Sequence, residues 1–188
     1  AEEALLALAK YYMQKFDIIK IAVTGSNGKT TTKDMIHAIM SVKYKTHKTP
    51  VNRNNLIGLP LTVLSLDEDA EAAVFEMGMD ARGDISRLTA VVKPDISVIT
   101  NVGVSHLERL GTRENILAAK LEITEGMADG SPLILCGDND LLSTVEIPRL
   151  RVLRYGIEAP ELDARAEEIV TGEGETRFVI VWKGGRYP

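Results

Sequence analysis

Short apolar runs and longer amphipathic stretches alternate along the first 140 or so residues of the chain. The short runs predict buried strands at 18–23, 72–76, 95–100 and 132–136. Apolar residues at helical spacing predict helices at 3–15, 29–41, 57–66, 83–93 and 114–127. Strands that alternate with helices are typical of a mostly parallel sheet with helices on both faces. We therefore expect an α/β fold.

The pattern changes after Arg149. Strands are predicted at 151–155, 163–170 and 176–182, without long helices between them, which indicates a small C-terminal antiparallel region. Gly184-Gly185 is a hairpin signal. Because the chain stops at Pro188, we expect the second strand of this hairpin to be missing.

Two of the predicted helices carry apolar residues along one side. In the helix 29–41, one side carries Met35, Ile36, Ile39 and Met40, which predicts its buried face. In the helix 114–127, Lys120 shares a stripe with Ile116, Ile123 and Met127. A lysine on an apolar face tends to lose its proton. The alternative is a packed stem with the ammonium group in water.

Composition excludes several classes of protein. Hydrophobic residues make up 45% and charged residues 26% of the 188, which is typical of a globular chain. The net charge of −5 gives no basic footprint, so we expect no nucleic-acid partner. No apolar run approaches the roughly 20 residues of a membrane span. Cys136 is the one cysteine, which excludes a disulfide and fits a reducing cytoplasm.

The segment between the first predicted strand and the helix 29–41 is rich in glycine. It reads Thr24-Gly25-Ser26-Asn27-Gly28-Lys29-Thr30. Backbone N–H groups of such a turn and a helix N-terminus bind phosphates, a lysine reaches the outer phosphates, and a threonine hydroxyl ligates magnesium. This P-loop predicts binding of ATP and Mg²⁺. It lacks the usual first glycine of the motif, because Val23 or Thr24 occupies that region, and the alternative is a simple turn with a solvated lysine.

Two further side chains follow predicted strands. Glu76 ends the apolar run 72–75, and His106 comes shortly after the strand 95–100. The carboxyl ends of parallel strands are where α/β folds bind ligands. The alternatives are an acid that faces solvent and a histidine with a structural or solvated role.

The loop and its continuation through Thr31-Thr32 resemble the phosphate loop of the Mur ligases, the ATP-dependent amino-acid ligases of peptidoglycan synthesis. Folylpolyglutamate synthetases share this loop. Further segments, in family order within residues 20–125, resemble the Mur ligases that add D-alanyl-D-alanine. They are Asn52-Arg53-Asn54-Asn55-Leu56-Ile57-Gly58-Leu59-Pro60, Glu76-Met77-Gly78, Gly83-Asp84-Ile85, Thr100-Asn101-Val102-Gly103, His106-Leu107-Glu108 and Ala119-Lys120-Leu121-Glu122-Ile123.

The resemblance implies an activity and its substrates. A carboxylate of UDP-MurNAc-tripeptide would attack the γ-phosphate of ATP to give an acyl phosphate, and the amine of D-alanyl-D-alanine would displace phosphate. Cell-wall biogenesis, and with it cell shape and division, depends on this product. The alternatives are another Mur-type or folylpolyglutamate-type ligase, a nucleotide-binding module, and an ATP-binding fragment without catalytic activity.

The resemblance also implies roles for individual residues. The residues that bind phosphate would be Thr24, Gly25, Ser26, Asn27, Gly28, Lys29, Thr30 and Thr31. Magnesium ligands would be Thr30, Glu76, His106 and Lys120, the last as a carbamate, and Lys29, His106 and Lys120 would be the catalytic residues. Asn52, Asn54, Asn55 and Asn101 would lie on the substrate side.

The same resemblance suggests where domains begin and end. Residues 1–16 would be a linker helix that follows an N-terminal domain, and residues 17–188 would form the central ATP-binding domain. The family's N-terminal UDP-sugar domain and C-terminal ligase domain have no counterpart here. The start at Ala1-Glu2-Glu3, with neither a methionine nor a signal peptide, also suggests a fragment of a longer cytoplasmic protein.

Overall fold

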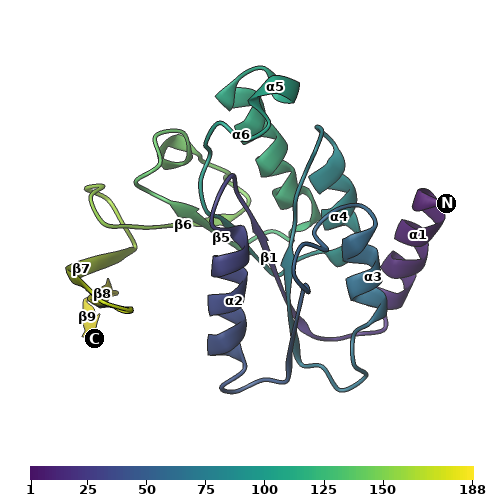
Figure 1. Cartoon of the computed structure of the whole chain (residues 1–188), viewed down its shortest axis with the longest axis horizontal. Helices are drawn as coiled ribbons and strands as arrows, with labels where there is room; N and C mark the ends of the chain where they lie inside the picture. The colour runs from purple at the N-terminus through teal and green to yellow at the C-terminus, as the bar shows by residue number, and fades with distance from the viewer.

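The computed structural model describes all 188 residues and has the expected α/β architecture (Figure 1). The helices are α1 (Glu2–Met13), α2 (Lys29–Met40), α3 (Gly58–Leu64), α4 (Asp84–Val92), α5 (Leu107–Leu110) and α6 (Arg113–Leu121), with 3-10 turns η1 (Glu122–Gly126) and η2 (Leu142–Thr144). The strands are β1 (Ile19–Thr24), β2 (Thr46–Lys48), β3 (Ala72–Glu76), β4 (Ile96–Ile99), β5 (Pro132–Cys136), β6 (Arg151–Gly156), β7 (Ala164–Gly172), β8 (Glu175–Trp182) and β9 (Gly185–Tyr187). No helix is both long and apolar enough to cross a membrane.

One sheet contains all nine strands, in the order β2-β3-β1-β4-β5-β6-β7-β8-β9. The strands from β2 to β7 pair in parallel, and β7, β8 and β9 pair antiparallel. This confirms the predicted parallel sheet with a small antiparallel region, which projects to one side in Figure 1. The expectation of a missing second hairpin strand was wrong, because Gly185–Tyr187 pairs with β8 as β9.

The two faces of the sheet are covered unequally. Alternate side chains of a strand point to opposite faces. Ala22 and Phe75 therefore join the large core formed with α1, α3, α4 and α6. Their neighbours Val23 and Val74 belong to a small cluster of four buried residues on the other face, against which Ile36 of α2 packs. Helices cover both faces as predicted, but α2 is the one long helix on its side.

The buried face of α2 differs from the prediction. Met35 and Ile39 are 62% and 72% exposed, whereas Lys33 is 1% exposed. The helical pattern 114–127 also ends earlier than predicted, since α6 stops at Leu121 and continues as η1. Its buried stripe is nevertheless present, and Lys120 lies in it with 1% exposure.

The strand order places a binding crevice in the middle of the sheet. The connection after β1 runs through α2 to β2, on one side of β1, while the connection after β3 runs through α4 to β4, on the other. Ligands of open α/β sheets bind outside the carboxyl ends of neighbouring strands whose connections diverge in this way. Thr24 and Glu76 end the strands β1 and β3 and therefore flank this point.

Candidate nucleotide and metal site

The Gly-rich loop adopts a backbone that two of its residues permit. Gly25 has φ +151°, and a Cβ there would lie 1.9 Å from Thr100 Oγ1. Gly28 has φ +78° and immediately precedes the first turn of α2. A side chain would strain the backbone at both positions. The sequence pattern of this loop thus reflects a sharp turn from β1 into a helix N-terminus.

The segment after β4 holds the loop in shape. Asn101 Oδ1 accepts hydrogen bonds from the backbone N–H groups of Ser26 and Asn27, at 3.0 and 2.9 Å. Thr100 Oγ1 donates to the Asn27 carbonyl at 2.6 Å, and the Gly103 N–H donates to Ser26 Oγ at 2.9 Å. Two backbone donors expected to face phosphates are therefore paired with Asn101.

The first turn of α2 supplies the remaining donors. The N–H groups of Lys29, Thr30 and Thr31 have no partner within the helix, because the first turn of any helix leaves them free, and no side chain caps this N-terminus. The helix dipole adds partial positive charge at the same place. Lys29 Nζ lies close by and donates to the Gly25 carbonyl at 3.0 Å. This arrangement suits a phosphate group.

Glu76 is held beside the loop by contacts from two directions. Its Oε2 accepts from Thr30 Oγ1 at 2.9 Å, and its Oε1 accepts from Asn54 Nδ2 at 2.8 Å. The carboxylate is 1% exposed. A carboxylate and a hydroxyl next to a phosphate site are hard oxygen ligands of the kind that magnesium prefers. Thr30 and Glu76 therefore fit the predicted metal.

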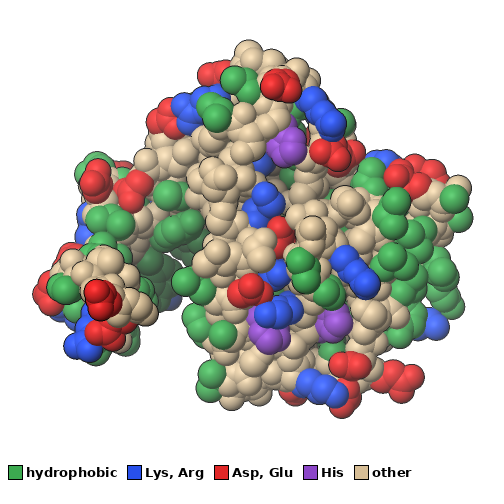
Figure 2. Space-filling view, viewed as in Figure 1, with side chains coloured by type: hydrophobic (Ala, Val, Ile, Leu, Met, Phe, Trp, Pro, Cys, Tyr) green, Lys and Arg blue, Asp and Glu red, His purple; other side chains and the backbone are tan.

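A cavity of about 200 Å³ brings together most of the other predicted residues. It is lined by Thr24, Gly25, Lys29, Asn54, Asn55, Gly78, Met79, Asp80, His106 and Lys120. Figure 2 shows basic, acidic and histidine side chains gathered along the hollow between α2 and α3. No group of three or more His, Cys, Asp or Glu side chains is arranged to bind a metal, so any ion at His106 would need Lys120 or substrate oxygens as further ligands.

Lys120 has the most perturbed amine of the site. Burial, and to a smaller extent the neighbouring charge of Lys29, lowers the pKa of Lys120 to about 7. At 1% exposure the side chain is packed within the protein, and only the wall of the cavity gives it access to small molecules. A substantial fraction of this amine is therefore neutral and nucleophilic near neutral pH.

The asparagines predicted on the substrate side occupy different positions. Asn54 and Asn55 line the cavity, and Asn55 Oδ1 also accepts from the backbone N–H groups of Ile57 and Gly58 at the start of α3. Asn101 faces the loop, and Asn52 is exposed and outside the cavity.

Two charged residues near the site were missed from the sequence. Asp80 lines the cavity, and Arg109 forms an ion pair with it at 3.1 Å. In the sequence, Asp80 lies four residues beyond Glu76 and just after a buried strand, and this position was the signal that could have identified it. Lys33 is buried behind Glu76, with 3.7 Å between Nζ and Oε2. The signal for Lys33 was its position four residues after Lys29, on the same side of a helix.

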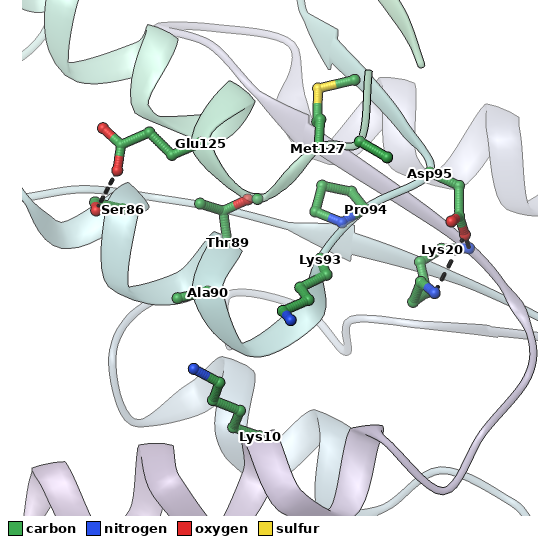
Figure 3. Close-up of a pocket in the computed structure, with 12 residues that line it drawn as sticks. Lys10, Lys20, Ser86, Thr89, Ala90, Lys93, Pro94, Asp95, Glu125 and Met127 are labelled. Atoms are coloured by element: carbon green, nitrogen blue, oxygen red, sulfur yellow. Dashed lines mark hydrogen bonds and ion pairs between the residues drawn. The ribbon is translucent and has the colours of Figure 1, made fainter. Parts of the chain in front are cut away.

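A larger cavity of about 580 Å³ lies at the opposite edge of the sheet (Figure 3). Lys20 and Asp95, near the amino ends of β1 and β4, form an ion pair at 3.5 Å on one wall of this cavity. Ser86 donates to Glu125 on another wall. Lys10 and Lys93 also line this cavity without an ion-pair partner, and it contains none of the predicted site residues.

Comparison with known proteins identifies the family. The Mur ligase middle domain matches residues 23–188. The UDP-N-acetylmuramoyl-tripeptide–D-alanyl-D-alanine ligase of Bacillus subtilis (strain 168) is 47% identical over 177 residues, which cover 94% of this chain and 38% of that relative. The chain thus spans less than half the length of this relative.

Solved structures agree with this match. A crystal structure of MurF from Acinetobacter baumannii has a TM-score of 0.92 at 30% identity and covers 98% of this chain and 41% of its own. MurF from Thermotoga maritima in complex with ADP has a TM-score of 0.90 at 33% identity, covering 99% and 43%. With a family match over most of its length, the chain belongs to the Mur ligase family, of which it contains the middle domain.

Proposed function

We propose that this chain is the ATP- and magnesium-binding part of a ligase that joins D-alanyl-D-alanine to UDP-MurNAc-tripeptide in peptidoglycan synthesis. The observation that carries the proposal is the 47% identity, over 94% of this chain, to a relative with that name. The phosphate loop supports the same reading, since its free helix N-terminus and Lys29 lie at the carboxyl edge of the sheet.

The reaction class requires an anion to attack an anion. A carboxylate oxygen of the tripeptide attacks the γ-phosphorus of ATP, ADP leaves, and the amine of the dipeptide then attacks the acyl carbon and expels phosphate. The main task of the site is to position the two reactants and to offset their charge repulsion. Lys29 and the N-terminus of α2 supply positive charge at the phosphates, and bound magnesium would add more.

Thr30 and Glu76 are the residues that would hold a magnesium ion near the phosphates. Their oxygens are 2.9 Å apart, and Asn54 fixes the second carboxylate oxygen from the opposite side. The carboxylate is thus oriented by protein contacts before any ion binds. A metal ligand with its orientation fixed in this way generally binds more tightly.

A second metal position would involve His106 and a carbamate on Lys120. The neutral amine attacks carbon dioxide, a nitrogen–carbon bond forms, and one proton is released to give a carboxylate. The burial of Lys120 and its place on the cavity wall with His106 support this step. Carbon-13 NMR of the chain in labelled bicarbonate is expected to show a carbamate resonance that Lys120→Met abolishes. Its absence in the unmodified chain would contradict the assignment.

The proposal extends to the longer protein. Residues 1–16 would link an N-terminal UDP-sugar domain to the nucleotide domain at 17–188, and a C-terminal domain would bind the dipeptide. Asn54 and Asn55 would contact the sugar-peptide, because both line the cavity next to Lys29. Asn52 and Asn101 would also lie on the substrate side, but neither lines the cavity. We place the protein in the cytoplasm, whose reducing conditions fit a chain with a single cysteine.

Calorimetric titration of Mg-ATP into the chain tests the nucleotide part of the proposal. Lys29→Ala is expected to weaken binding at least tenfold, because it removes the lysine whose ammonium group lies against the loop. Lys43→Ala, on the exposed loop after α2, is the matched control and should bind like the parent chain. Equal affinity of all three proteins would contradict the phosphate-loop assignment. Ligation of D-alanyl-D-alanine by the longer protein, measured with and without Lys29→Ala, tests the rest.

A further inference from the structure

Lys33 is a buried lysine that lies behind Glu76 and does not line the cavity. It lies on α2, one turn beyond Lys29, and its side chain is 2% exposed. Nζ donates to the Thr49 carbonyl at 3.0 Å. It also lies 3.5 Å from Asp34 Oδ1 and 3.7 Å from Glu76 Oε2. Burying a charged amine is costly unless nearby groups compensate its charge, so this arrangement needs a reason.

Its neighbours connect the phosphate loop to the metal carboxylate. Glu76 Oε2 accepts from Thr30 on one side and faces the Lys33 ammonium on the other. Thr49, which accepts from Lys33 through its carbonyl, also accepts from the Glu76 backbone N–H through Oγ1, at 3.0 Å. Lys33 and Thr49 together therefore fix both the backbone and the side chain of Glu76.

We propose that Lys33 is a positioning residue that holds the Glu76 carboxylate, as an anion, in place beside Thr30, and so determines how strongly magnesium enhances nucleotide binding. This inference rests on the proposed magnesium–nucleotide site. Lys33 itself does not line the cavity, and its ammonium group is held against Thr49, Asp34 and Glu76. Its effect must therefore pass through Glu76.

The test compares ADP binding with magnesium and with EDTA in the same protein. Lys33→Met is expected to lower the magnesium enhancement about 10- to 100-fold, the range typical of groups that orient a metal ligand. Binding of metal-free ADP depends on the N–H groups in the first turn of α2 and on Lys29, and it should change less than about threefold. A role in folding alone would lower the melting temperature without changing the ratio of the two affinities.

Lys48→Met is the matched control. Lys48 also pairs with Asp34, at 2.8 Å, but is partly exposed and has no contact with Glu76, so its loss should leave the enhancement unchanged. If Lys33→Met does not fold, Lys33→Gln keeps a polar donor near Thr49 and takes its place. In a Glu76→Gln background, removal of Lys33 should have no further effect on the enhancement.

The outcomes separate the two proposals. No magnesium enhancement in the parent chain would overturn the proposed metal site and this inference with it. If magnesium enhances ADP binding equally in the parent and in the Lys33 variants, the inference alone is overturned. The same holds if Lys48→Met lowers this enhancement as much as the Lys33 variants do. Failure of both Lys33 variants to fold would also overturn it, because Lys33 would then be needed for the core.

Discussion

Replacing Lys120 by methionine is expected to change how the stability of the chain depends on pH. The unfolded chain keeps the proton on this amine up to its ordinary pKa of 10.5, whereas the folded chain releases it above about pH 7. Between these values the unfolded state binds more protons, so the folded chain gains stability as the pH rises. Below pH 7 both states are protonated and the destabilisation is greatest and constant.

The magnitude follows from the two pKa values. One pKa unit corresponds to about 1.4 kcal/mol, so burying protonated Lys120 costs up to about 5 kcal/mol. Lys120→Met removes this cost. The variant should have a higher free energy of unfolding than the parent chain, and this difference, the gap, should be largest at low pH. The gap should narrow by about 1.4 kcal/mol per pH unit from pH 7.5 to 9.5.

Urea unfolding followed by circular dichroism at pH 7, 8 and 9 measures this gap. The buffers should contain EDTA and no carbon dioxide, so that neither metal binding nor carbamate formation contributes. Lys43→Met, at an exposed site, is the control, and its gap from the parent should be small at every pH. A Lys120→Met gap that stays constant within about 0.5 kcal/mol would show that the amine is solvated, contrary to its burial.

Three further outcomes are expected. Gly25→Ala should weaken ADP binding about tenfold or more in calorimetry, because its Cβ would overlap Thr100; unchanged affinity would mean that the loop tolerates another shape. Phe75→Ala should lower the free energy of unfolding by about 3–5 kcal/mol, because Phe75 is fully buried. Phe178 is half-exposed, so Phe178→Ala should lower it by less than about 1 kcal/mol. Equal losses would contradict the assignment of Phe75, and not Phe178, to the core. The 188 residues alone should form no D-alanyl-D-alanine amide by mass spectrometry, and a product would show that the flanking domains are dispensable.

The sequence predicted the main strands because they are short apolar runs whose residues are buried or half-buried. The strand 132–136 was predicted with the bounds that the structure has, and 72–76 likewise. β2 was missed because Thr46–Lys48 has no apolar residue and is only half-buried. The apolar side of α2 was predicted only in part, because Ile36 and Met40 pack against the sheet whereas Met35 and Ile39 are exposed. The burial of Lys33 was missed because its contacts are with polar groups of Thr49 and Glu76, which helical spacing does not reveal.

The candidate site was predictable where a residue type has a specific chemical use. The predicted residues follow the carboxyl ends of strands or lie on one helix, and the structure places them around one crevice. They are the loop, Glu76, His106 and Lys120. The geometry of side-chain amides was not predictable. Asn101 was predicted on the substrate side, and its contact with the loop depends on a pairing between residues 75 positions apart. Its substrate role stays a prediction.

That amide has a consequence for affinity. By binding two N–H groups of the loop, Asn101 gives the loop its shape before any nucleotide arrives. A nucleotide that met a disordered loop would have to order it, at about 1–2 kcal/mol for each backbone residue fixed. Here the loop is preorganised, and its entropy is lost once, when the chain folds. Part of the affinity for phosphate is therefore set by an interaction between two segments of the protein, in the absence of any ligand.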